Sequence, residues 1–416
     1  MHTTVVDLGY GDAGKGAVVA RLCQERTVTA VVRFNGGPQA AHNVVTADGR
    51  HHTFAQFGAG TFHGTPTHLS RFMSVDPLAL AAEADHLRAL GVPAPYGLLT
   101  VDRAARLVTP YHAAANRLRE QARGADRHGS CGMGVGETAR YALAYPADAP
   151  TVGDCASRPR LLRTLRLLRD RLTDELGPLP APPVEDCAAA FAAFADAVAL
   201  TDETHLRRLV RSGPLVFEGA QGVLLDEWHG FHPYTTWSTT TFANAETLLA
   251  EAGAADAARR IGVVRTYTVR HGPGPHVTEE PELAAALPEP HNGHGRWQGA
   301  FRVGHFDAVA HAYAVAVCGG VDALAVTHLD APPRCPALRI CHGYAIEGRL
   351  VERLPVGRPG DLDRQAALTR QLLDAHPALW STPEHWPATI SALLGAPVVM
   401  ESYGPARQTL TGAGVG

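Results

Sequence analysis

The sequence predicts an α/β protein with a largely parallel central sheet and flanking helices. Short runs of apolar, often β-branched residues recur along the chain, and glycines bound them. Such near-continuous apolar runs are typical of strands that are buried on both faces. Polar, glycine-rich segments follow several of these runs. Because ligands of open α/β sheets bind outside the carboxyl ends of the strands, the pattern also predicts a ligand cleft at that edge.

The apolar runs place the strands in order along the chain. We expect strands at residues 5–8, 30–34, 215–218, 261–267 and 323–329. We expect helices between them, at residues 77–90, 158–176, 187–199 and 306–317. The second of these helices has leucines at helical spacing with arginines opposite, which indicates one buried face. The last helix opens with Asp307, and an acidic residue in the first turn is favourable.

The proline-rich segment 177–183 separates two of the expected helices. Such a segment is either a domain boundary or a loop. We interpret it as a loop within a helical insertion at about residues 156–212, because strand patterns resume only near Leu215. We therefore expect residues 1–416 to form a single domain, with a last strand and a tail within residues 402–416.

Composition excludes several classes of protein. The formal net charge of -4 argues against general nucleic-acid binding and against a membrane-surface partner. The seven cysteines are odd in number and form no Cys-x-x-Cys pair, which disfavours a disulfide framework or a cysteine zinc site. The N-terminus runs directly into a predicted strand, and no uncharged apolar stretch reaches about 18 residues. We expect a cytoplasmic protein.

The chain contains one lysine, Lys15, within the turn Gly11-Asp12-Ala13-Gly14-Lys15-Gly16. Of the 37 lysine and arginine residues, all except Lys15 are arginine. Lysine and arginine exchange freely on a solvated surface, but not where a compact ammonium meets a phosphate. Strand, glycine turn and helix in that order also place backbone N–H groups around an anion. The alternative is a tight turn with a surface lysine; the lysine bias and the neighbouring Asp12 favour a phosphate loop.

Five further segments are polar and rich in glycine, hydroxyl or amide residues. They are residues 34–43, 129–136, 217–226, 235–241 and 327–330. Each taken alone also fits an ordinary loop, but we expect all five at strand ends of one sheet, as the walls of a cleft would be. Asp330 ends the last segment, and a carboxylate there can accept hydrogen bonds from N1–H and N2–H of a guanine base. A guanine nucleotide is therefore a candidate ligand.

Taken in order, these segments resemble the adenylosuccinate synthetase family, whose members use GTP to join aspartate to inosine monophosphate. The turn at 11–16 is similar to the family's GDEGKG loop, residues 36–42 to GGxNAGH, and residues 132–136 to GRGIG. Residues 217–226 are similar to FEGAQGTLLD, and residues 267–279 to YxTRVGxGPFPTE. Residues 327–330 and 402–405 are similar to the two guanine-contacting segments. The resemblance covers nearly the whole chain and implies a P-loop-like GTP-binding ligase architecture, a homodimer and a place in purine biosynthesis.

The resemblance implies a role for each matching residue. Asp12 would be the general base at N1 of the nucleotide, and Gln221 would orient its O6 region. His42 and Lys15 would contact the GTP phosphates. Mg²⁺ would bind Asp12 and the Ala41 carbonyl. GTP would contact Gly11, Gly14, Lys15, Gly16, His42, His328, Asp330, Ser402 and Gly404. The nucleotide substrate would contact Asp12, Gln39, Cys131, Arg140, Gln221 and Thr236, with Arg140 reaching the partner subunit's nucleotide.

The segment 294–305 departs from the family's arginine-rich donor loop, TTGRRRRTGW. Arg302 keeps its place and Arg296 is a substitute, so these two are the expected donor-binding residues. Aspartate has two carboxylates, and binding both of them takes about two bidentate arginines. Trp297, Ala300 and Phe301 stand where guanidinium groups are usual, so we expect a donor that is not aspartate bound in the usual way. The alternative is that backbone N–H groups and Arg296 rebuild the aspartate pocket.

Two other classes of function remain open at this point. The chain could bind guanine nucleotides without ligase activity, or it could be a small-molecule kinase that stops at a phosphoryl intermediate. Asp12, His42 and Gln221 favour a ligase, because binding alone needs no base beside a phosphate.

Overall fold

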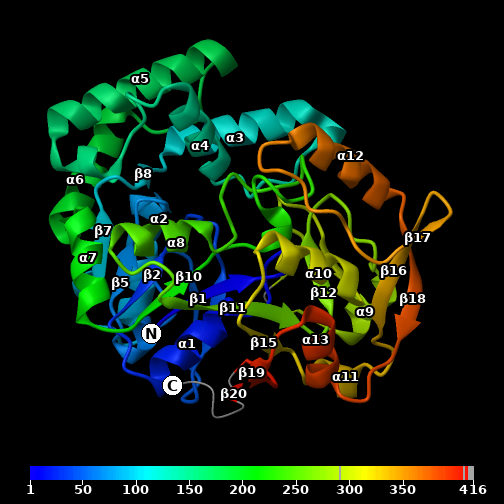
Figure 1. The fold of residues 1–416 in the computed structure, drawn as a ribbon. Coiled ribbons are helices and arrows are strands. Elements are labelled where there is room, and N and C mark those ends of the chain that lie inside the picture. The colour runs from blue at the N-terminus through cyan, green and yellow to red at the C-terminus, as the bar shows by residue number, and fades with distance from the viewer. Residues whose placement is uncertain (290–291, 406–407, 411–416) are drawn as a thin grey trace.

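The computed structural model describes residues 1–289, 292–405 and 408–410, and a ten-stranded sheet crosses its centre (Figure 1). The strand order is β20-β19-β15-β11-β1-β10-β2-β5-β7-β9, and every pairing is parallel except that of β19 with β20. The sheet consists of β1 (His2–Asp7), β2 (Ala30–Arg33), β5 (Thr67–Leu69), β7 (Leu99–Asp102), β9 (Ala199–Thr201), β10 (Leu215–Glu218), β11 (Ala258–Arg265), β15 (Ala323–Thr327), β19 (Val398–Ser402) and β20 (Gln408–Leu410). The predicted α/β class with a largely parallel sheet is confirmed.

Helices cover both faces of this sheet. They are α1 (Lys15–Glu25), α2 (Pro77–Ala89), α3 (Pro110–Arg123), α4 (Val135–Ala144), α5 (Arg158–Leu176), α6 (Val184–Ala197), α7 (Glu203–Ser212), α8 (Ala243–Glu251), α9 (Pro281–Ala286), α10 (Ala308–Val317), α11 (Ala331–Arg334), α12 (Leu362–Leu373) and α13 (Trp386–Leu394). Along β1, Val5 belongs to the core that includes α1, α2, α5 and α6, whereas Val6 belongs to the core that includes α8, α10 and α13. Because successive strand residues point to opposite faces of the sheet, a run of consecutive apolar residues contributes to the cores on both faces.

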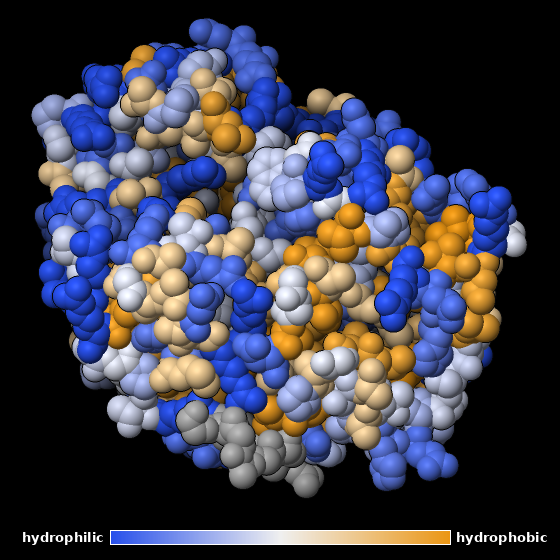
Figure 2. Space-filling view, in the orientation of Figure 1, coloured by the Kyte–Doolittle hydropathy of each residue, from blue (hydrophilic) through white to orange (hydrophobic). Residues whose placement is uncertain are grey.

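The remaining strands form small sheets around this core. They are β3 (His42–Val45) with β4 (His51–Phe54), β6 (Ser74–Val75) with β8 (Arg106–Leu107), and β12 (Thr268–His271) with β13 (Phe301–Gly304). A four-stranded sheet contains β14 (Phe306–Asp307), β16 (Ile340–Ile346), β17 (Arg349–Val351) and β18 (His376–Ser381). In Figure 2 hydrophilic residues dominate the end of the molecule that carries α5, while hydrophobic residues gather on the side of β16–β18, where Leu350 and Leu379 are exposed.

All five expected strands and all four expected helices are present, with shifted ends. The strands expected to end at Tyr267 and Leu329 stop at Arg265 and Thr327, where parallel pairing of β11 with β15 ends. The helix expected from residue 306 begins at Ala308, because Asp307 accepts from the Ala310 N–H and is the N-cap.

The expected helical insertion is helical only in part. It contains α5, α6 and α7, and the proline-rich segment joins α5 to α6. The expectation that strands resume only near Leu215 is wrong, because Ala199–Thr201 forms β9 and pairs with β7 at the edge of the sheet. Its three residues are too short for a reliable sequence signal. The extent of a single domain over residues 1–416 stays a prediction.

At the C-terminus, β19 ends at Ser402 and β20 follows at Gln408–Leu410. The expected tail after residue 410 lies outside the described residues. Within the described residues, no helix combines the length and the apolar character that crossing a membrane requires.

Candidate active site at the carboxyl edge of the sheet

The sheet gathers the predicted segments at one edge. The glycine turn follows β1, the Gln221 turn follows β10, the segment 34–43 follows β2, and the His328 turn follows β15. Because β11, β1, β10 and β2 are neighbours in the sheet, three of these four turns lie side by side, and the fourth is two strands away from β1. This strand order confirms that these four segments meet at the carboxyl edge of the sheet, and a ligand cleft there stays a prediction. The expectation that segments 129–136 and 235–241 also follow strands of this sheet is wrong, because the first joins α3 to α4 and the second directly precedes α8.

Three of the predicted site residues have a left-handed backbone. Asp12, Gln221 and His328 have φ angles of 60°, 56° and 56°, and only Asp256 and Glu347 share this property among the described non-glycine residues. Side chains disfavour this region, and proteins concentrate such strain at functional sites.

Lys15 is buried, and its partner is a carboxylate that sequence reasoning missed. The Lys15 Nζ lies 3.2 Å from Asp7 Oδ2, and the side-chain exposure of the two residues is 3% and 0%. Asp7 also accepts from the N–H groups of Gly9 (2.8 Å), Gly11 (3.3 Å) and Ala13 (2.8 Å). The alternative of a surface lysine is therefore wrong. The sequence offered one signal for this pair, because Asp7 is a carboxylate within an apolar strand, eight residues before the only lysine.

Glycines let the three loops touch. A Cβ on Gly16 would lie 2.9 Å from the Cβ of His42, and a Cβ on Gly222 would lie 2.2 Å from the carbonyl oxygen of Gly9. Both distances are too short for a real side chain, so glycine at these two positions is what brings His42 and the Gln221 turn against the phosphate loop.

His42 forms a buried pair with Glu218, the last residue of β10. Its Nδ1 lies 2.6 Å from Glu218 Oε1, while Glu218 Oε2 accepts from the Ala59 N–H at 3.0 Å. Burial lowers the pKa of His42 to about 4 although Glu218 opposes the shift, so the ring is neutral at pH 7. With Nδ1–H donating to Glu218, Nε2 is left as an acceptor. Donation from Nε2 to GTP requires a second proton, which the negative charge of a bound triphosphate favours.

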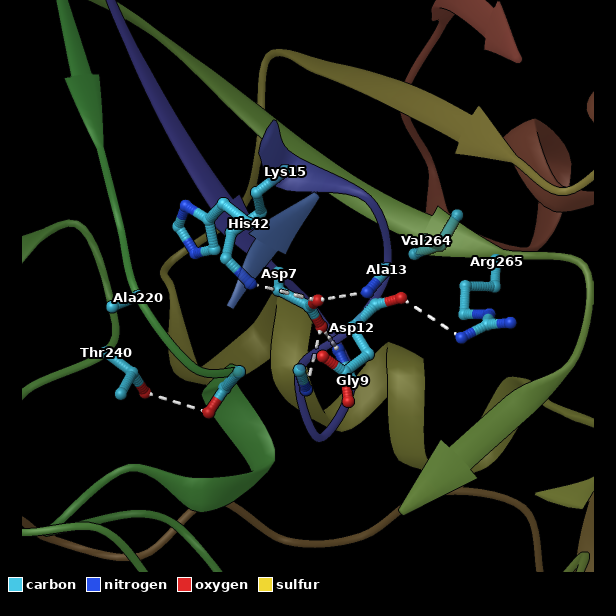
Figure 3. Close-up of polar contacts among 12 residues, drawn as sticks. Asp7, Gly9, Asp12, Ala13, Lys15, His42, Ala220, Thr240, Val264 and Arg265 are labelled. Carbon is cyan, nitrogen blue, oxygen red and sulfur yellow. Dashed lines mark hydrogen bonds and ion pairs between the residues drawn. The ribbon is translucent and has the colours of Figure 1, made fainter. Parts of the chain in front are cut away.

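Asp12 contacts two residues that the sequence did not point to. Arg265 Nη1 donates to the Asp12 carbonyl oxygen at 3.1 Å (Figure 3). His271 Nε2 lies 3.1 Å from Asp12 Oδ2. Burial raises the pKa of the Asp12 carboxyl, but the hydrogen bond from His271 and the charges of His271, Lys15 and Arg265 outweigh it, and the pKa falls below its usual value. For His271, burial lowers the pKa, and the contact with Asp12 outweighs this effect and raises it. Asp12 is therefore an ionised carboxylate that is available as a base.

Several buried polar atoms at this edge have no protein partner. Within the described ranges, Gln39 Oε1, His42 Nε2, Gln221 Oε1 and Asp330 Oδ1 make no hydrogen bond. Buried polar atoms are nearly always paired, so unpaired ones at a cleft indicate atoms that a ligand or water satisfies. The other Asp330 oxygen accepts from Arg334 Nη2 at 2.8 Å, which holds the carboxylate in place.

The predicted donor arginines are engaged within the protein. Arg302 donates from Nε to Glu279 at 2.9 Å and from Nη1 to the carbonyl oxygens of Gly272 and Gly274. Arg296 is exposed and stacks over Trp297, with 5.2 Å from guanidinium carbon to ring centroid. Their binding of a donor stays a prediction.

The residues expected around the nucleotide phosphate lie on the α4 side of the cleft. Cys131 precedes α4 and is partly buried, whereas Arg140 on α4 pairs with Glu175 of α5 at 2.8 Å. Thr236 donates its backbone N–H to Leu225 at 2.8 Å. Ser402 accepts from the Leu329 N–H through its carbonyl oxygen, which ties the two expected guanine-contacting segments together. The binding roles of all these residues stay predictions.

The described residues hold no cluster of three or more histidine, cysteine or acidic side chains that could bind a metal alone. Asp12 and the Ala41 carbonyl nevertheless fit Mg²⁺, because it prefers oxygen ligands and usually takes the others from water and substrate phosphates. The contact of Asp12 with His271 uses Oδ2 rather than Oδ1. These two residues suit a metal that arrives with a nucleotide.

Known proteins resemble this chain over its whole length. The family model described as adenylosuccinate synthetase matches residues 4–411. The adenylosuccinate synthetase of Desulfovibrio desulfuricans is 30% identical over 434 residues, which covers 98% of each protein. That of Neisseria gonorrhoeae is 31% identical over 441 residues, with 98% of this chain and 97% of the relative covered.

Solved structures share the fold. A fully ligated adenylosuccinate synthetase from Plasmodium falciparum matches with a TM-score of 0.83 at 19% identity, over 99% of this chain and 100% of the other. A succinoaminodeoxyadenylate synthetase of cyanophage S-2L, bound to dGMP and to dATP as an energy donor, matches with a TM-score of 0.60 at 20% identity, over 98% and 95%. The matched family model and the curated relatives show that this chain belongs to the adenylosuccinate synthetase family of GTP-dependent ligases.

Proposed function

We propose that the protein uses GTP to replace the 6-oxygen of an IMP-like purine nucleotide with the amine of aspartate or a related donor. The observation that carries this proposal is the ionised Asp12, which has a strained backbone and lies in the same loop as buried Lys15. At Gly16 the chain after this loop touches His42. A nucleotide-binding protein without chemistry needs no base at this position.

The residues divide the reaction into two displacements. Asp12 takes the proton from N1, O6 attacks the γ-phosphorus of GTP, and the bond to GDP breaks. The donor amine then attacks C6, the C6–O bond breaks, and phosphate leaves with that electron pair and with one proton from the amine. Gln221 orients O6, and the turn amides with Lys15 hold phosphate oxygens. Mg²⁺, when bound at Asp12 and Ala41, would neutralise charge on the phosphates.

The donor pocket supports a departure from ordinary aspartate binding. Arg302 is already bonded to Glu279 and two carbonyl oxygens, and Arg296 faces Trp297. Fewer free guanidinium forks suit a donor with less charge or a larger side chain. The family assignment also supports a homodimer and a place in the cytoplasm.

Phosphate release from GTP tests the function. We expect release only when an IMP-like nucleotide and an amine are both present, with the adduct detected by mass spectrometry across a panel of amino acids. Conversion of GTP to GDP with the nucleotide alone, with the phosphoryl group retained on the nucleotide and no free phosphate, would indicate a kinase. Binding of GTP with neither product would indicate a non-catalytic protein. A low KM for aspartate, with turnover above every other amine, would overturn the proposed donor pocket.

Replacing Asp12 tests its role as the base. Asp12→Asn is expected to lower kcat by at least ~10²-fold, because loss of a general base costs about that much, while GTP still binds. Turnover and GTP affinity of the purified variant are measured side by side. Unchanged turnover would remove Asp12 from this role.

A further inference from the structure

His271 makes a contact that the catalytic roles above do not use. It is the last residue of β12 and pairs with Phe301 of β13 in an antiparallel ladder. Its ring lies 4.8 Å from the Phe301 ring, centroid to centroid, and its side chain is only 25% exposed. The same ladder pairs Arg270 with Arg302 at the next position. The ring is therefore held by the strand pair that carries the end of the donor loop.

The other side of this ring faces Asp12. His271 Nε2 lies 3.1 Å from Oδ2 of that carboxylate, within hydrogen-bonding distance. The Asp12 backbone is held separately, because Arg265 of β11 donates to its carbonyl oxygen at 3.1 Å. Arg265 of β11 thus holds the main chain of the left-handed residue Asp12, and His271 of β12 holds its carboxylate. A strained turn keeps its geometry only where its surroundings determine it in this way.

The sequence shows that this contact distinguishes the chain from the family pattern. In YxTRVGxGPFPTE, the position of His271 is valine, which cannot donate a hydrogen bond. Beside Asp12, the glutamate of GDEGKG is Ala13, which is buried. Relative to the family pattern, the chain therefore lacks the acidic side chain next to Asp12 and has the imidazole of His271 beside the Asp12 carboxylate.

We propose that His271 is a positioning residue for Asp12, with Nε2–H donating to Oδ2 so that the carboxylate is held in one orientation. This inference rests on the proposed function of Asp12. A carboxylate that rotates freely spends less time in the reactive orientation, and a displacement of about 1 Å can cost up to ~10²-fold in rate. Substrate binding does not depend on this contact, so kcat is affected rather than KM.

Two substitutions separate the hydrogen bond from the packing of the ring. Glutamine places an N–H close to the position of Nε2, whereas valine restores the family residue and removes the donor. We expect His271→Val to lower kcat about 10- to 100-fold with KM for GTP and nucleotide within about twofold, and His271→Gln to keep at least about a third of kcat. His63→Val is the matched control, because His63 is exposed and lies in the short turn Thr61–His63, outside the loops that carry the predicted site residues.

The partial reaction provides a readout that does not depend on the donor. With β,γ-bridge ¹⁸O-labelled GTP and nucleotide but no amine, phosphoryl transfer to O6 scrambles the label. We expect His271→Val to slow this exchange as much as it slows turnover, and His271→Gln to restore it. Equal loss in both variants would overturn the inference, because it would indicate ring packing on Phe301. Wild-type exchange in His271→Val would also overturn it.

Nuclear magnetic resonance tests the contact without any turnover. In the ¹⁵N-histidine-labelled full chain, the Nε2 signal that disappears in His271→Gln is expected to shift in Asp12→Ala. An unchanged signal overturns the inference even if the ligase is active. If the signal shifts in Asp12→Ala but the wild-type protein turns over no nucleotide, the contact is supported and the proposed function is overturned. The two failures can therefore be told apart.

Discussion

The phosphate loop carries its own counter-charge. Asp7 neutralises Lys15, and it occupies the N–H groups of Gly9, Gly11 and Ala13. Such a buried pair contributes little net stability, because desolvation offsets the attraction, but removal of one partner leaves an unpaired buried charge. At the residue scale, the pair fixes the shape of the turn that presents Asp12, and the remaining loop amides and the α1 N-terminus are left for phosphate.

The guanine preference also belongs to single residues. Asp330 Oδ1 is buried without a hydrogen-bond partner in the described chain, so a base that offers N1–H and N2–H satisfies it and adenine does not. We expect GTP to exceed ATP in kcat/KM by about 10- to 100-fold, since an unpaired buried carboxylate oxygen costs about 1–3 kcal/mol. Asp330→Asn should reduce this ratio severalfold. Kinetics with both triphosphates measure it; equal efficiency of ATP and GTP in the wild type would contradict the assignment.

At the scale of elements, close backbone approaches assemble the site. A Cβ at Gly222 would meet the backbone of Gly9 at 2.2 Å and of Gly11 at 2.4 Å. We therefore expect Gly222→Ala to push the Gln221 turn away from the phosphate loop and to lower kcat by at least about tenfold. Gly97→Ala is the control, because its nearest neighbour would be a Cβ at 3.9 Å. Circular dichroism confirms the fold of both variants, and equal activity would contradict the role of this contact.

The N-cap of α10 makes stability depend on pH. Burial raises the pKa of Asp307 to about 6, although the Ala310 N–H and the Tyr344 hydroxyl bind its carboxylate. Because the folded pKa lies above the unfolded value, the neutral form stabilises the fold below pH about 4, and this contribution is lost as pH rises through 6. The loss is of order 1–3 kcal/mol.

Asp307→Asn removes this titration and keeps an acceptor for the cap. The free energy of unfolding of the variant, relative to wild type, is expected to rise between pH 4.5 and 7.5 by about 1–3 kcal/mol. Urea denaturation at both pH values measures the difference. Asp361→Asn, at the exposed N-cap of α12, should show the same difference at both pH values. A pH-independent effect of Asp307→Asn would refute the prediction.

At the scale of the whole molecule, the proposed homodimer would place Arg140 at the nucleotide of the partner subunit. Within this chain, Arg140 lies on α4 and pairs with Glu175 of α5. In a homodimer with sites shared between subunits, inactive Asp12→Ala and inactive Arg140→Ala should complement each other. Random mixing leaves one intact site in half of the dimers, so we expect about a quarter of wild-type activity. No recovery after mixing, or a monomer at micromolar concentration by light scattering, would contradict the shared site.

Local patterns predicted the parallel sheet, the meeting of the Asp12, Gln221 and His328 turns at its carboxyl edge, and the family. Apolar runs and glycine turns are local signals, and residues 158–176 form α5 as expected because one face repeats leucine. The three-dimensional fold was needed to show that Asp7 holds Lys15, that Glu218 holds His42 and that His271 and Arg265 hold Asp12. His42 and Glu218 are 176 residues apart in the sequence, and Asp12 and Arg265 are 253 residues apart. Asp7 lies in a strand whose apolar pattern predicts only core. Such contacts depend on strand order and on where the chain leaves each strand, which no local pattern encodes.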